Sequence, residues 1–83
     1  MPKLPRVSSK ETIKALERLG FVQIRQKGSH VILKKIIATK ENDGNDLEIG
    51  CVVPVQKKNL AIGTLKNILN QAGISVVKFI DNL

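Results

Sequence analysis

Hydrophobic and polar positions in the first quarter of the chain repeat with the period of an amphipathic helix. Three hydrophobic residues there are spaced three apart: Ile13, Leu16 and Leu19. This spacing places the side chains on one side of an α-helix. Ser8 is followed three residues later by Glu11, which is the pattern of an N-terminal capping box, and Gly20 follows the last hydrophobic residue. The pattern predicts a helix over residues 9–19.

Two runs rich in β-branched residues follow, over residues 21–26 and 30–36, and they flank Lys27-Gly28-Ser29. Short runs of this kind around a glycine-containing link predict a β-hairpin. If Lys27-Gly28 forms a two-residue turn, antiparallel pairing sets Arg25 opposite His30. A four-residue loop would keep the same faces, whereas a three-residue loop would exchange them.

The predicted pairing separates the hairpin into two faces. One face is apolar and consists of Val22, Ile24, Val31 and Leu33. The other is largely polar and consists of Gln23, Arg25, His30, Ile32 and Lys34. We therefore expect the first set against the core and the second set in solvent.

The rest of the chain predicts a loop, a third strand and a second helix. Residues 39–46 are polar and surround Gly44, as is typical of a loop. Hydrophobic residues then alternate over 49–55, where Pro54 indicates an edge strand or a strand end. A helical pattern covers residues 64–72 and ends at Gly73, and the last residues, 75–83, predict a short turn or helix that packs on the body.

The predicted order is helix, three strands, helix, within a single domain over residues 1–83. Three consecutive antiparallel strands with one apolar face need both helices against that face to bury it. The fold class is therefore α+β, with a three-stranded antiparallel sheet and one face left open. This arrangement resembles the double-stranded RNA-binding domain.

The charge of the chain favours a polyanionic partner. Fourteen Lys and Arg oppose seven Asp and Glu, which gives a net charge of +7, and four of the acids lie within residues 41–48. The remainder is therefore strongly basic, as expected for a protein that binds a polyanion. Solubility and an acidic protein partner are alternative explanations. Trp and Tyr are absent and there are two Phe, so aromatic stacking is not the main means of binding.

A lone cysteine and the hydropathy pattern indicate a cytoplasmic protein. Cys51 has no partner for an intrachain disulfide, and the adjacent Val52 and Val53 favour a buried, inert thiol. The first six residues lack the apolar core of a signal peptide, and no apolar run approaches the ~20 residues that span a bilayer.

The sequence offers no convincing metal or cofactor site. One His and one distant Cys do not supply the ligands that zinc requires. Asp43, Asp46 and Glu48 could hold Mg²⁺ through oxygen atoms, but they lack the spacing of a calcium-binding loop, so a solvated loop is favoured. Motifs for phosphate loops, dinucleotides and serine nucleophiles are also missing.

His30 is the candidate catalytic residue, although a lone histidine in a small domain is more often a surface or packing residue. A neutral imidazole can remove the proton of a ribose 2′-hydroxyl, which then attacks the adjacent phosphate. A nearby cation stabilises the developing negative charge. Arg25 suits this role, and its charge also disfavours the imidazolium form of His30.

Several short blocks resemble the HicA family and follow its order along nearly the whole chain. They are Gly20-Phe21, residues 26–30 (Gln-Lys-Gly-Ser-His), residues 53–55 (Val-Pro-Val), residues 63–66 (Gly-Thr-Leu-Lys), Ile68-Leu69 and residues 72–74 (Ala-Gly-Ile). The resemblance implies a toxin that cleaves mRNA, has a fold like that of the double-stranded RNA-binding domain and is inhibited by a HicB-type antitoxin. It also implies that His30 is catalytic. Residues 36–47 depart from the family pattern by being longer and more acidic.

The remaining predicted site residues would contact RNA. They are Arg25, Lys27, Gly28, Ser29, Lys34, Lys57, Lys58 and Lys66. Gly28 is equally well explained as a turn glycine with a positive φ, and each lysine taken singly is an ordinary solvated side chain. The leading hypothesis is a metal-independent endoribonuclease without a cofactor. The alternatives are a non-catalytic RNA-binding module and a basic interaction protein.

Overall fold

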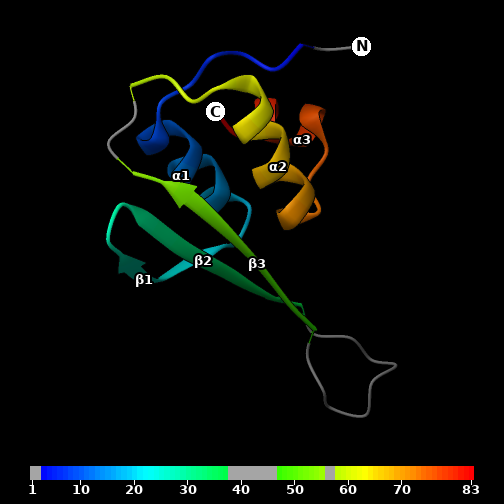
Figure 1. Cartoon of the computed structure of the whole chain (residues 1–83). Helices are drawn as coiled ribbons and strands as arrows, with labels where there is room; N and C mark the ends of the chain where they lie inside the picture. Colours follow the sequence, from blue (N-terminus) through cyan, green and yellow to red (C-terminus); the bar gives the residue numbers. More distant parts are fainter. Residues whose placement is uncertain (1–2, 38–46, 56–57) are drawn as a thin grey trace.

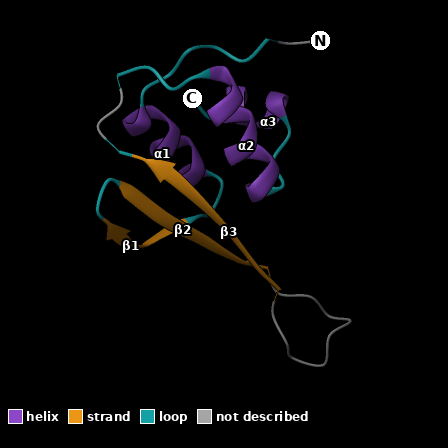
Figure 2. Ribbon diagram, in the orientation of Figure 1, coloured by secondary structure: helices purple, strands orange, loops and turns teal. Residues whose placement is uncertain are grey.

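The computed structural model describes residues 3–37, 47–55 and 58–83. The elements are α1 (Ser9–Arg18), β1 (Val22–Lys27), β2 (His30–Ile37), β3 (Leu47–Pro54), α2 (Ile62–Ala72) and α3 (Val76–Asp81). The strands form an antiparallel sheet in the order β1-β2-β3, and the helices lie together on one side of it (Figures 1 and 2). The predicted α+β fold is confirmed. The predicted loop at residues 39–46 lies outside the described residues.

Local signals define both ends of α1. The Ser8 side chain accepts a hydrogen bond from the Glu11 backbone N–H, and the Glu11 carboxylate accepts one from the Ser8 N–H, each at 3.1 Å. This is the predicted capping box, which satisfies two backbone donors that the helix leaves free. The helix ends at Arg18, one residue before the predicted end, because Leu19 is its C-cap.

One hydrophobic core joins the helices to the inner face of the sheet. Its fully buried side chains include Leu16 of α1, Leu33 of β2, Val53 of β3, Leu65 of α2 and Phe79 of α3. The hydrophobic stripes of the two predicted helices therefore meet alternate residues of the central strand and of β3. The C-terminal segment is a helix, and Phe79 ties it to the core.

The second helix ends where the sequence predicted, and the third strand is at an edge of the described sheet and ends at Pro54, one residue before the end of the predicted run. Gly73 is the C-cap of α2 and has a φ of 67°, the left-handed conformation that glycine adopts without steric cost. β3 is an edge strand of the described sheet and ends at Pro54. The Gln71 side chain of α2 accepts a hydrogen bond from the Val52 N–H at 3.3 Å, which satisfies one backbone donor of that strand.

The hairpin register differs from the prediction. Gly28-Ser29, rather than Lys27-Gly28, forms the two-residue turn, so Lys27 pairs with His30 and Arg25 pairs with Ile32. The predicted pairing of Arg25 with His30 is wrong. Arg25 and His30 still lie on the same face of the sheet. The new partner of Arg25, Ile32, is two positions from His30, and side chains two positions apart on a strand point to the same side.

A β-bulge in β1 reverses which side of the sheet the residues before Arg25 face. The register shifts between Gln23 and Arg25, so Val22 pairs with Lys34 and Gln23 with Leu33. An extra residue in one strand inverts the alternation of side chains that follow it. Val22 and Ile24 are accordingly 61% and 54% exposed. The prediction that they join the core face is wrong.

Candidate nucleic-acid interface

His30 is the first residue of β2 and is exposed on the open side of the sheet. Its register partners are Lys27 on β1 and Pro54 on β3, so it lies in the middle of a row that crosses all three described strands. The Ser29 hydroxyl lies 3.4 Å from His30 Nδ1. This contact leaves Nε2 as the ring nitrogen that can face a ligand.

Hydrogen bonds from β1 and from the residue after β3 hold the hairpin turn next to His30. Gly28 has a φ of 59°, which confirms its role as a turn glycine, and its carbonyl accepts a hydrogen bond from Gln26 Nε2 at 3.1 Å. The Ser29 carbonyl accepts a hydrogen bond from the Val55 N–H at 2.8 Å. The turn is thereby fixed to the end of β3, which limits the freedom of the imidazole beside it.

Three predicted cations share the open face with His30. Lys27 lies directly opposite it, and Arg25 lies one diagonal step away, opposite Ile32. Lys34 follows on the same face of β2, and its Nζ is 3.5 Å from Glu48 Oε1. The positive charge is therefore greatest at the His30 end of the face, because Glu48 offsets that of Lys34.

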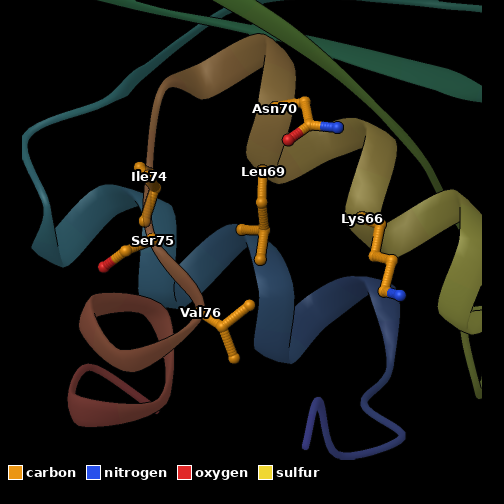
Figure 3. A pocket seen from close by; sticks show the side chains of 6 residues that line it. All are labelled: Lys66, Leu69, Asn70, Ile74, Ser75 and Val76. Carbon is orange, nitrogen blue, oxygen red and sulfur yellow. The ribbon is translucent and has the colours of Figure 1, made fainter. Parts of the chain in front are cut away.

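Of the other predicted RNA-binding lysines, Lys66 lies apart from this group. Lys66 is on α2, in the helical layer, and borders a pocket of about 300 Å³ with Leu69, Asn70 and the segment that leads to α3 (Figure 3). Lys58 is exposed in the connection that follows β3. Lys57 lies outside the described residues.

Sequence reasoning missed an apolar hollow at the far end of the open face. It has a volume of about 380 Å³ and is lined by Gly20, Val22, Ile24, Lys34, Ile36 and Glu48. The expected polar face therefore carries exposed aliphatic side chains at the end away from His30, beside Lys34 and Glu48. The hollow depends on the bulge in β1, and nothing in the residue pattern of that strand marks the bulge.

The thiol of Cys51 is buried in the core, as predicted. Its side chain is 2% exposed, and burial raises the pKa of the thiol to about 11. Desolvation disfavours the thiolate, which is the nucleophilic and metal-binding form. Cys51 therefore belongs to the core rather than to the open face.

Among residues 3–37, 47–55 and 58–83, no three His, Cys, Asp or Glu side chains gather as a metal site would require. Of the acidic side chains considered above, Asp43 and Asp46 lie outside these ranges, and Glu48 pairs with Lys34. Within the same ranges, no helix is both long enough and apolar enough to span a membrane.

The element order and the basic open face define a small α+β protein like the double-stranded RNA-binding domain. Residues 9–74 match the family model described as the HicA toxin of bacterial toxin-antitoxin systems. The chain therefore belongs to the HicA toxin family, which confirms the resemblance seen in the sequence. No curated protein matches the chain.

Proposed function

We propose that the protein is the toxin of a toxin-antitoxin system and acts as a metal-independent endoribonuclease on mRNA, with His30 as its catalytic residue. The arrangement of His30 supports this most directly. An exposed imidazole lies on an open sheet face with Lys27 directly opposite and Arg25 one diagonal step away. General base catalysis by a neutral imidazole with cationic stabilisation of the phosphate needs no metal ion.

In this mechanism the neutral His30 imidazole accepts the proton of a ribose 2′-hydroxyl. The 2′-oxygen forms a bond to the adjacent phosphorus as the bond from phosphorus to the 5′-oxygen breaks. The products are a 2′,3′-cyclic phosphate and a 5′-hydroxyl. The leaving 5′-oxygen takes a proton from the imidazolium, from a lysine or from water, so the proton balance closes without a second histidine.

Lys27 and Arg25 would stabilise the charge that develops on the phosphate oxygens. Lys27 is opposite His30, where Cβ atoms of paired residues are ~4.5–5.5 Å apart. The flexible Lys27 side chain, attached to the chain at that distance, can bring its ammonium group to a phosphate held at the imidazole. Lys34, Lys57 and Lys58, together with the turn residues Gly28 and Ser29, would then add contacts to neighbouring nucleotides. Lys66 would contact RNA where the strand passes the helical layer.

The proposed setting is the bacterial cytoplasm, where a HicB-type antitoxin would inhibit the toxin. Membership of the HicA toxin family supports this assignment. An inhibitor of a basic toxin would have the best electrostatic complementarity, and would also block catalysis, if it covered the face that carries both His30 and its cations. We therefore expect the antitoxin to be acidic at its contact and to cover the open face.

The test is cleavage of a labelled mRNA by purified protein in excess EDTA, with chemical analysis of the new ends. We expect cleavage with 2′,3′-cyclic phosphate and 5′-hydroxyl termini. RNA binding without cleavage would support the alternative of a non-catalytic RNA-binding module. Cleavage that EDTA stops and Mg²⁺ restores would contradict the metal-independent mechanism and direct attention to the acidic residues at 41–48.

A further inference from the structure

The hollow at the far end of the open face has the features of a base-binding site. Val22, Ile24 and Ile36 form an aliphatic wall, and Lys34 and Glu48 border the same space. Its volume of about 380 Å³ falls in the range of small-ligand sites. We propose that it binds one unpaired base of a single-stranded RNA, with preference for guanine, a proposal that rests on the ribonuclease function above.

The ion pair supplies a hydrogen-bond donor and an acceptor side by side. Lys34 Nζ and Glu48 Oε1 are 3.5 Å apart, and the side chains remain 41% and 58% exposed. Guanine presents a complementary edge, because its O6 accepts hydrogen bonds beside N1–H and N2–H groups that donate. A carboxylate can accept from both donors while the ammonium donates to O6. Adenine and uracil do not offer two adjacent donors to one carboxylate.

The composition of the wall suits an unpaired base rather than a duplex. Bases in an A-form helix are stacked, and side chains cannot read its deep, narrow major groove. An unstacked base can place its flat surface on Val22, Ile24 and Ile36, which are 61%, 54% and 64% exposed. Contact with the base would remove this apolar surface from water.

The hollow lies on the same face as His30, but some distance along the sheet. Lys34 is four residues beyond His30 on β2, or ~13 Å at the usual rise of a strand. A base bound there belongs to a nucleotide near the cleaved one, rather than to the cleaved nucleotide itself. The site would therefore select where along an RNA the cut falls.

A protein partner fits this hollow less well than a base. An aliphatic anchor would cover the wall, but it would also desolvate Lys34 and Glu48 without giving either a hydrogen bond. A guanine would cover the apolar wall and would also form hydrogen bonds with both charged groups. The cations at the His30 end of the same face, Lys27 and Arg25, complement the phosphates of the same strand.

Binding measurements on an uncleavable background would test the proposal. His30→Ala protein would be titrated with labelled uridine-rich oligonucleotides that carry one central guanine or adenine and no secondary structure. We expect about tenfold tighter binding of the guanine oligonucleotide. Val22→Ser should weaken that binding by about three- to tenfold. The matched control is Val77→Ser, a 52% exposed position on α3, which should leave binding unchanged.

Glu48→Gln provides a second, more specific readout. It frees Lys34 from its partner, so affinity for the adenine oligonucleotide should rise while the preference for guanine disappears. A purely electrostatic role for Glu48 would instead raise both affinities equally and contradict base recognition. Chimeric oligonucleotides with the guanine moved along the strand should shift the cleavage position of the protein with His30 intact.

The outcomes separate this proposal from the ribonuclease function. If the protein cleaves RNA but neither the guanine preference nor the effect of Val22→Ser appears, the hollow is not a base site and a protein-binding surface becomes the better explanation. If the protein with His30 intact neither binds nor cleaves RNA, both proposals are wrong.

Discussion

Lys27 lies directly opposite His30 in the residue pair that closes the β1–β2 hairpin. Arg25, which the sequence had suggested for that position, lies opposite Ile32. The observed register therefore predicts different roles for the two cations. Electrostatic stabilisation is strongest where a charge is held close to the reacting phosphate, so Lys27 should contribute more to the chemical step and Arg25 more to binding.

Lys27→Ala should lower kcat for RNA cleavage by about 10²-fold, because it removes the cation expected nearest to the developing phosphate charge. Arg25→Ala should raise KM with a smaller effect on kcat. Single-turnover cleavage at several protein concentrations separates the two parameters. Lys27→Arg should restore part of the rate. Equal losses of kcat for the two alanine variants would contradict the ranking that the register gives.

His30→Ala should abolish measurable cleavage while leaving the fold and most RNA affinity intact. A general base typically contributes ~10²- to 10⁴-fold in rate. His30 is exposed, and surface substitutions usually change the free energy of unfolding by less than ~0.5 kcal/mol. Cleavage, circular dichroism and salt-dependent RNA binding should be measured on the same preparation. A folded variant that cuts at the rate of the unmodified protein would refute the catalytic assignment.

The elements were predictable because their signals are local. The capping box at Ser8 and Glu11 and the left-handed Gly73 each need only a few neighbouring residues, and both are present as predicted. The burial of Cys51 followed from its hydrophobic neighbours. A periodic pattern likewise places Leu65 in the core, since one face of a helix must be covered.

The pairing of strands was less predictable because two small features determine it. Moving the turn by one residue to Gly28-Ser29 places Lys27 opposite His30, and the bulge near Ile24 transfers Val22 to the open face. Residue types on β1 fit either arrangement. The candidate site residues could thus be proposed from residue type and spacing, whereas their neighbours and the apolar hollow required the three-dimensional structure.

Cys51 should make the free energy of unfolding depend on pH in the alkaline range. Its pKa is about 11 in the folded protein and near 9.0 in an exposed thiol, so the folded state keeps a proton that the unfolded chain loses. The contribution of Cys51 is fully present below pH 9 and is lost as the pH rises towards 11. Its size is on the order of 2 kcal/mol.

The measurement is urea denaturation at a series of pH values from 8 to 11, for the unmodified protein and for Cys51→Ala. The lysines titrate in both proteins, so the difference between their stabilities isolates the thiol. We expect this difference to shrink as the pH rises. A constant difference across the range would mean that the folded protein does not hold the thiol proton more strongly than the unfolded chain.

The last prediction concerns α3, which lies beyond the segment that matches the HicA family, residues 9–74. Phe79 of this helix is fully buried, and Arg18 Nη1 of α1 donates a hydrogen bond to the Asn82 carbonyl at 2.8 Å. Phe79→Ala should therefore lower the free energy of unfolding by about 3–5 kcal/mol. That is a large part of the total for a domain of this size.

The matched control is Val77→Ala, at a 52% exposed position of the same helix, which should cost less than ~0.5 kcal/mol. Urea denaturation followed by circular dichroism compares the two variants directly. If Phe79→Ala is as stable as Val77→Ala, the matched segment folds without help from α3; if it is much less stable, α3 completes the core on which the His30 face is built.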